Sequence, residues 1–259
     1  MRETSSIQPK PDGLPTPEVG AWAETKYRLV ALYDRLFSTG MKAKWDTRVY
    51  VDLYAGAGYA QIRGTNRIIH GSPLLALDVP DPFDKYIFCE ANSAFLQALE
   101  YRIARLFSGA NVQLILGDCN DKIDEMHAAI PKSSKRHTVL SFCFVDPFNI
   151  GIKFATVRKL ASHRMDFLVL LALYMDANRN VAHYTSPENS KVDEFLGTNA
   201  WRQRWQDEQR KGTDFPPFLA QEYARQMEAL GYLPRPMYEM KEVRSDEKNL
   251  PLYHLALFS

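Results

Sequence analysis

Three acidic residues recur along the chain at a constant step. Glu90, Asp118 and Asp146 lie 28 residues apart, each at the end of a short apolar run or in the turn after it. One strand and the helix that follows it take about 30 residues. The step therefore predicts that the three carboxylates lie at one edge of a parallel sheet, beyond the carboxyl ends of its strands. Ligands bind at that edge in open α/β folds.

A glycine-rich turn closes the first apolar run, in the sequence VDLYAGAG. Gly56 and Gly58 allow a tight turn and let a ligand approach the backbone where a Cβ atom would block it. Such a turn also occurs for geometry alone, but here Asp52 stands near the strand end and Glu90 closes the next strand. This combination favours a nucleotide-type ligand. We expect Glu90 to accept hydrogen bonds from two ribose hydroxyls and Asp118 to accept one from an adenine amino group.

Two cofactors compete for such a site, a dinucleotide and S-adenosylmethionine. A dinucleotide favours G-x-G-x-x-G with a helix that starts at once and faces the pyrophosphate. Gly58 is followed instead by YAQIRG, and the next helix start is Ser72-Pro73, a good N-cap and first-turn pair. S-adenosylmethionine carries no phosphate and tolerates this looser connection, so it is the predicted cofactor, and a dinucleotide enzyme is the alternative. The residues predicted to hold it are Asp52, Tyr54, Gly56, Gly58, Glu90 and Asp118.

The sequence SFCFVDPFNIG carries the candidate acceptor site at Asp146, Pro147 and Phe148. It resembles the Asp/Asn-Pro-Pro-aromatic motif of amino-group methyltransferases. There the acid and a backbone carbonyl accept from an exocyclic amine, the ring stacks on a base, and catalysis comes from orientation. Phe148 replaces the second Pro and Asn149 follows, so the match is partial. The alternative is a strand-end Asp-Pro turn with Phe148 in the core.

Apolar runs alternate with helix-like stretches through the first two thirds of the chain. The runs are rich in Val, Ile, Leu and Phe without polar alternation, which indicates strands buried on both faces of a parallel sheet. Repeated strand–helix units predict an α/β, Rossmann-like, doubly wound fold, and S-adenosylmethionine as the predicted cofactor makes the class I methyltransferase fold the expected type. The last two runs, 237–244 and 252–258, predict a C-terminal antiparallel hairpin. The five earlier runs are 49–54, 86–89, 112–116, 139–145 and 167–173.

The remaining segments define the predicted domain organisation. Residues 1–17 contain four prolines among polar residues and predict a disordered arm. Residues 18–259 form one predicted domain, with an amphipathic helix near 19–37 and a helical insertion at 178–231. Trp201 and Trp205 in that insertion fit either a basic base-stacking surface or, as we favour, the buried stripe of an amphipathic helix.

Composition limits the classes of function. The formal net charge of the 259 residues is +1, so nucleic acid would need a local patch rather than a global field. The cysteines, Cys89, Cys119 and Cys143, show no metal-ligand spacing, and we expect buried, reduced thiols and no metal. The longest apolar stretch falls short of the ~20 residues of a membrane span, and the N-terminus lacks a hydrophobic signal core. We expect a cytoplasmic protein that does not bind membranes.

Several motifs together resemble the three-Cys-motif partner proteins (TcmP family), from about residue 19 to the C-terminus. They are Trp22 and Lys26 before the sheet, VDLYAGAG, GSPLLAL, FCE and VDPF. The resemblance implies a methyltransferase-like fold and a protein partner that bears a three-cysteine motif of radical-SAM character and is encoded nearby. It supplies no substrate. The DPF element is also similar to DPFG of tRNA guanine-N2 methyltransferases, with Asn149 in place of the glycine.

These observations predict methyl transfer from S-adenosylmethionine to an amino group of nucleic acid. The alternative is a non-catalytic S-adenosylmethionine-binding subunit of the three-cysteine partner, since a methyltransferase fold does not by itself establish methyl transfer. The Asp146-Pro147 pair favours catalysis. The missing second Pro and the neutral overall charge favour the alternative.

Overall fold

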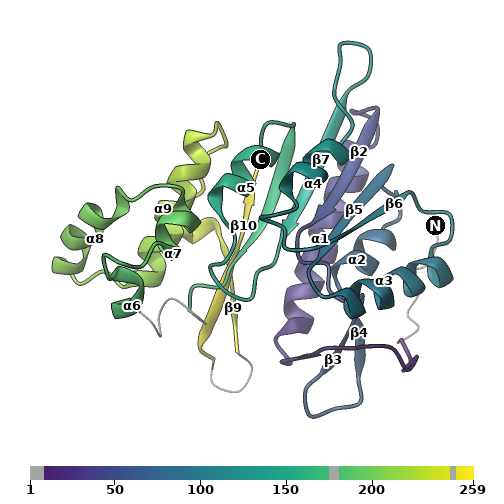
Figure 1. Ribbon diagram of the computed structural model, residues 1–259, viewed down its shortest axis with the longest axis horizontal. Helices are drawn as coiled ribbons and strands as arrows, with labels where there is room; N and C mark the ends of the chain where they lie inside the picture. The colour runs from purple at the N-terminus through teal and green to yellow at the C-terminus, as the bar shows by residue number, and fades with distance from the viewer. Residues whose placement is uncertain (1–8, 175–180, 246–248) are drawn as a thin grey trace. The chain divides into compact units, whose positions relative to one another are not determined.

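The computed structural model describes residues 9–174, 181–245 and 249–259 (Figure 1). The chain divides into two compact units, residues 1–144 and residues 145–259.

The first unit is built around four parallel strands. β2 pairs with both β5 and β7, and β5 pairs with β6. Nearly every residue of β2 and all of β7 are buried, which is why their sequences lack polar alternation. The strands are β2 (Thr47–Asp52), β5 (Lys85–Glu90), β6 (Val112–Leu116) and β7 (Val139–Val145).

Helices cover both faces of these strands (Figure 1). Phe37 of α1 contacts Phe142 of β7 and so packs on the face that carries Tyr50. Lys85 of β5 lies on the opposite face and donates to the Ala129 carbonyl at the end of α4. The helices of this unit are α1 (Ala23–Met41), α2 (Ser72–Leu77), α3 (Ser93–Leu106) and α4 (Ile123–Ala129).

A small second sheet follows the glycine turn. β3 (Tyr59–Ile62) and β4 (Ile68–His70) form an antiparallel hairpin, and β1 (Glu18–Val19) pairs with β3 in parallel. Residues 9–17, the described part of the predicted N-terminal arm, lead into β1 and make side-chain contacts with α3. The chain returns from β4 to the glycine turn, because the Gly71 N–H donates to the Gly58 carbonyl at 2.7 Å.

The second unit contains the remaining strands and five helices of the described chain. β10 (Pro251–Phe258) runs antiparallel to β8 (Met165–Leu171) and to β9 (Lys241–Arg244). The segment of the predicted insertion is helical where it is described. The helices are α5 (Phe154–Leu160), α6 (Val181–Thr185), α7 (Lys191–Leu196), α8 (Trp201–Arg210) and α9 (Phe215–Ala229), and a short 3₁₀ turn η2 (Met237–Glu239) precedes β9.

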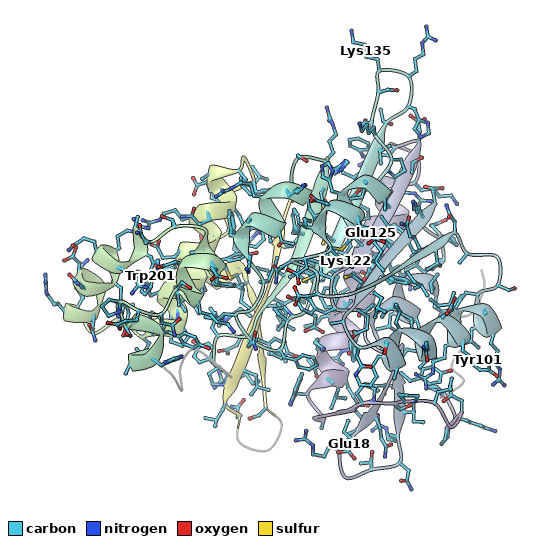
Figure 2. The ribbon with its side chains drawn as sticks, in the orientation of Figure 1. Glu18, Tyr101, Lys122, Glu125, Lys135 and Trp201 are labelled. Atoms are coloured by element: carbon cyan, nitrogen blue, oxygen red, sulfur yellow. The ribbon has the colours of Figure 1, made fainter. Side chains whose placement is uncertain are left out.

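Trp201, which Figure 2 labels, and Trp205 belong to α8, and both are buried in the helical segment. Trp201 is fully buried and Trp205 is nearly so. The ring of Trp205 lies 4.8 Å from that of Phe215 and 5.1 Å from that of Phe218. The interpretation as a buried helical stripe is confirmed, and the base-stacking surface is wrong for these two residues.

The order of strands in the large sheet is β6-β5-β2-β7-β8-β10-β9. Numbered within this sheet, the order is 3-2-1-4-5-7-6. This order differs from the nucleotide-binding Rossmann order, 3-2-1-4-5-6, by one strand. The last strand, β10, lies between β8 and β9 and is antiparallel to both. The predicted fold class is confirmed as a Rossmann-like, mostly parallel α/β sheet with a C-terminal antiparallel hairpin.

Candidate cofactor site

The glycine turn after β2 adopts a backbone that requires glycine at two positions. Gly56 and Gly58 have φ values of 66° and 81°, in the left-handed region that other residues rarely adopt. A Cβ atom on Gly58 would lie 2.9 Å from the side chain of Leu99 and 3.3 Å from that of Leu74, whereas one on Gly56 would meet nothing within 4 Å. Gly58 therefore permits close packing against α2 and α3, and Gly56 leaves open space above the turn.

Alanine at position 58 is expected to destabilise the protein by about 2–5 kcal/mol, because the left-handed backbone and the overpacking against Leu99 both oppose it. Gly64 offers a matched control, since its φ is 74° and a Cβ atom added there would meet nothing within 4 Å. Gly64→Ala should cost only the backbone strain, about 1–2 kcal/mol. Urea unfolding of both variants measures the difference. Equal losses would show that packing at Gly58 contributes nothing.

Glu90, the last residue of β5, joins its strand end to the glycine turn. Its Oε2 accepts from the Gly56 N–H at 2.8 Å, and its Oε1 accepts from the Asn92 N–H at 2.8 Å. A carboxylate has about four acceptor positions. The two backbone bonds leave positions with which Glu90 can accept from a ligand, and they hold the carboxylate at the edge of the sheet.

Asp118 lies in the turn after β6, beside the end of β5. The Gly117 N–H donates to the Glu90 carbonyl at 3.0 Å, so the two strand ends are adjacent. The Asp118 side chain is exposed and accepts from the Asn120 N–H at 2.8 Å. Lys122, at the start of α4, is ion-paired with Glu125 at 3.2 Å (Figure 2). An exposed acceptor thus stands next to Glu90, at the predicted edge.

Asp52 is buried and Tyr54 is half-buried, so neither is fully exposed at the turn. Asp52 is fully buried, and its Oδ1 accepts from the Tyr54 N–H at 3.1 Å, as Asp side chains do in Asx-turns. The Tyr54 side chain hydrogen-bonds to the thiol of Cys119 in the turn after β6. Through these hydrogen bonds, Asp52 and Tyr54 stabilise the conformation of the turn. All six residues predicted to hold the cofactor lie in the first unit.

A second buried carboxylate, Asp34 of α1, neighbours Asp52 and was not predicted as part of this region. It is fully buried, and neither of its carboxylate oxygens accepts a hydrogen bond from the described residues. Burial raises the pKa of Asp34 well above its ordinary value, and the nearby Asp52 carboxylate adds to the shift. Asp34 is therefore neutral in the folded protein over a range of pH in which it is ionised in the unfolded chain.

Asp34→Asn is expected to raise the free energy of unfolding at pH 7, because the folded protein then no longer has to keep a buried carboxyl protonated. The raised pKa means that the folded state holds a proton that the unfolded state releases above pH ~4. Wild-type stability therefore falls relative to the variant as pH rises from about 4. Asp46→Asn is the opposite control, because hydrogen bonds from Thr138 lower the pKa of Asp46; this variant should lose stability above pH ~4. Chemical unfolding between pH 4 and 8 tests both signs.

The candidate acceptor residues follow β7 directly and belong to the second unit. Asp146 is half-buried and Pro147 is buried, whereas the side chain of Phe148 is 90% exposed. The alternative in which Phe148 packs into the core is therefore wrong. The exposed ring of Phe148 is accessible to a ligand, and the acceptor role of Asp146, Pro147 and Phe148 stays a prediction.

The three cysteines are free and buried, as predicted. Burial raises the pKa of Cys89 to about 12 and that of Cys119 to about 11, so neither thiol is a reactive nucleophile at neutral pH. In the described residues, no group of three or more His, Cys, Asp or Glu side chains has the arrangement of a metal site. No helix in the described part of the chain combines the length and apolar composition of a membrane span.

Comparison with known proteins gives similarity only at the level of solved structures. No protein-family model matches the chain, and no curated protein matches it in sequence. An O-methyltransferase from Bacillus cereus in complex with SAH has a TM-score of 0.49 and 10% identity, over 95% of this chain and 84% of that one. A Legionella pneumophila protein of the family DUF519 has a TM-score of 0.45 and 12% identity, over 66% and 73%. A geranyl diphosphate methyltransferase in complex with GPP and sinefungin has a TM-score of 0.39 and 12% identity, over 83% and 64%.

Proposed function

We propose that this protein is an S-adenosylmethionine-dependent methyltransferase that acts on an amino group of nucleic acid. The observation that carries the proposal is the position of Glu90. Its carboxylate is held at the end of the second strand of the sheet by the Gly56 N–H, directly beside the glycine turn. An acid at this position of a Rossmann-like sheet binds the hydroxyls of a ribose.

The residues at this edge fit an adenosine. Glu90 keeps acceptor positions for two vicinal hydroxyls after its bonds to Gly56 and Asn92. Asp118 is exposed beside it and can accept from an exocyclic amino group. The open space above Gly56 admits a ligand to the backbone of the turn.

The helix beside the turn argues against a pyrophosphate dinucleotide. α2 begins only at Ser72, but the β3–β4 hairpin brings the start of this helix back to Gly58. The number of residues between Gly58 and α2 therefore does not decide the cofactor. The N–H groups at the start of α2 do. Phosphate binding needs free N–H groups at a helix N-terminus, but the Gly71 N–H is bonded to the Gly58 carbonyl and Pro73 has none. Ser72 and Leu74 are buried as well.

The segment after β7 supports an amine as acceptor. S-adenosylmethionine, when bound, supplies an activated methyl group on its sulfonium. Asp146 accepts from the target amino group and directs its lone pair, and the exposed ring of Phe148 stacks on the base. Stacking on an aromatic ring suits every base, so these residues select the chemical class rather than a sequence.

Isothermal titration tests the cofactor directly. We expect S-adenosylmethionine and its demethylated product to bind with micromolar dissociation constants, and NAD to give no heat of binding. If NAD binds and S-adenosylmethionine does not, the proposal is overturned and a dinucleotide enzyme is favoured.

A second candidate is a non-catalytic cofactor-binding subunit of a three-cysteine-motif protein. It is favoured by the outer face of α1, where Leu32 and Leu36 are 51% and 60% exposed, because such side chains are available to a partner. The resemblance to TcmP proteins supports the same assembly. This candidate is supported if the two proteins co-elute on gel filtration and if changing Leu32 and Leu36 to Ser abolishes the co-elution. Independent elution of the two wild-type proteins at micromolar concentration would count against it.

A further inference from the structure

Arg102 of α3 is a buried cation that the proposed chemistry does not use. Its side chain is 1% exposed, and a buried guanidinium is stable only when its donors are satisfied and its charge is neutralised. Among the described residues, every hydrogen-bond partner of its donors comes from two segments distant in sequence. One is the N-terminal arm, residues 12–16, and the other is the glycine turn.

The arm supplies the counter-charge. Asp12 accepts from Nε of Arg102 at 2.8 Å and from Nη2 at 2.7 Å, the two-pronged arrangement that is strongest between arginine and a carboxylate. This hydrogen bonding lowers the pKa of Asp12. Thr16 Oγ1 accepts from Nη2 at 3.1 Å and the Pro15 carbonyl from Nη1 at 3.0 Å. The arm therefore closes around the guanidinium on one side.

The glycine turn supplies the other side. Nη1 of Arg102 donates to the carbonyl of Ala57 at 2.6 Å, and Ala57 stands between Gly56 and Gly58. The guanidinium carbon also lies 4.3 Å from the centre of the Tyr59 ring, in the residue after the turn, a cation–π contact. One side chain thus holds both the middle of the turn and the strand that leaves it.

The arm is attached to the same strand a second time. The Pro17 carbonyl accepts from the Gln61 N–H at 2.9 Å, and Glu18 and Val19 pair with Gln61 and Ile62. Residues 12–19 therefore run from the Arg102 guanidinium to the β3 strand without leaving the neighbourhood of the turn.

We infer that Asp12 and Arg102 are positioning residues of the cofactor site: the N-terminal arm, through Arg102, holds the Gly56–Gly58 backbone in its ligand-binding conformation. Two glycines that flank a single residue widen the range of backbone conformations that this turn can adopt. A bond to the carbonyl between them restricts both. The inference rests on the proposed function, because the ligand of the turn is taken to be S-adenosylmethionine.

The test compares Asp12→Asn, which keeps the shape of the side chain, with Thr16→Val, a milder loss of one acceptor that serves if the first variant does not fold. Arg105→Gln, an exposed arginine one turn along α3, is the matched control. Each folded variant is titrated with S-adenosylmethionine well below its melting temperature. Amide hydrogen exchange of residues 55–60 is followed without ligand.

We expect the dissociation constant for S-adenosylmethionine to rise about tenfold in Asp12→Asn and about threefold in Thr16→Val. Amide exchange of residues 55–60 should be faster in both variants, and fastest in Asp12→Asn. Both properties should be unchanged in Arg105→Gln. In turnover, KM for the cofactor should rise while kcat stays the same, which a general loss of stability would not produce. If Asp12→Asn and Thr16→Val fold and show the same exchange rates and the same affinity as the wild type, the inference is overturned. If the wild type binds no S-adenosylmethionine, the proposed function is overturned. Faster exchange in Asp12→Asn would still show that the arm holds the glycine turn.

Discussion

Replacing Glu90 by Ala is expected to weaken S-adenosylmethionine binding by about tenfold or more. The change removes two charge-assisted hydrogen bonds to the ribose, each worth about 1.5–3 kcal/mol. It also releases the Gly56 and Asn92 N–H groups that Glu90 now accepts from. Titration calorimetry gives the affinity, and circular dichroism shows whether the fold is intact.

Glu90→Gln separates the two contributions of this side chain. The amide keeps an acceptor oxygen and the length of the side chain, so the turn can stay in place while the charge is lost. We expect an affinity between those of the wild type and Glu90→Ala. Glu100→Ala, an exposed acid on α3, should bind as the wild type does. Unchanged affinity in a folded Glu90→Ala protein would show that Glu90 only shapes the turn.

The large sheet could be predicted because its central strands, such as β2 and β7, are buried on both faces. β7, with all seven residues buried, is apolar except for Ser141, and burial on both faces is what removes the alternation. The β3–β4 hairpin could not be predicted in this way. Its strands have four and three residues, too short for a periodic pattern to stand out from a loop. As a result, the sequence suggested a long connection after Gly58, whereas the hairpin returns α2 to the turn.

The candidate site was predictable where its residues follow strands and not where they depend on tertiary contacts. Glu90 and Asp118 were found because parallel strand ends meet at one edge. Asp12 and Arg102 are 90 residues apart, and no local pattern links an arm aspartate to a helix arginine. Asp34 reads as an ordinary polar residue of an amphipathic helix, although it is fully buried on α1. Both cases require knowledge of which surfaces meet.

Asp146→Ala is expected to reduce methyl transfer by about two orders of magnitude or more while changing cofactor affinity by less than about fivefold. Asp146 belongs to the acceptor side of the proposed reaction. Its loss removes the orientation of the target amine and leaves Glu90, Asp118 and the glycine turn untouched. The assay supplies radiolabelled S-adenosylmethionine with total RNA, DNA and cell protein, and a parallel series adds the proposed three-cysteine-motif partner.

Two further variants decide what a loss of activity means. Phe148→Ala removes a ring that is 90% exposed and therefore supports no core packing, so reduced labelling in this variant reports lost stacking rather than lost stability. Asn149→Ala, at an exposed neighbour, should label as the wild type does. If Asp146→Ala labels as well as the wild type, Asp146 is only a strand-end turn and the acceptor site lies elsewhere. If the wild type binds cofactor but labels nothing in either series, the non-catalytic subunit becomes the better account, because a bound sulfonium without a positioned amine leaves the methyl group in place.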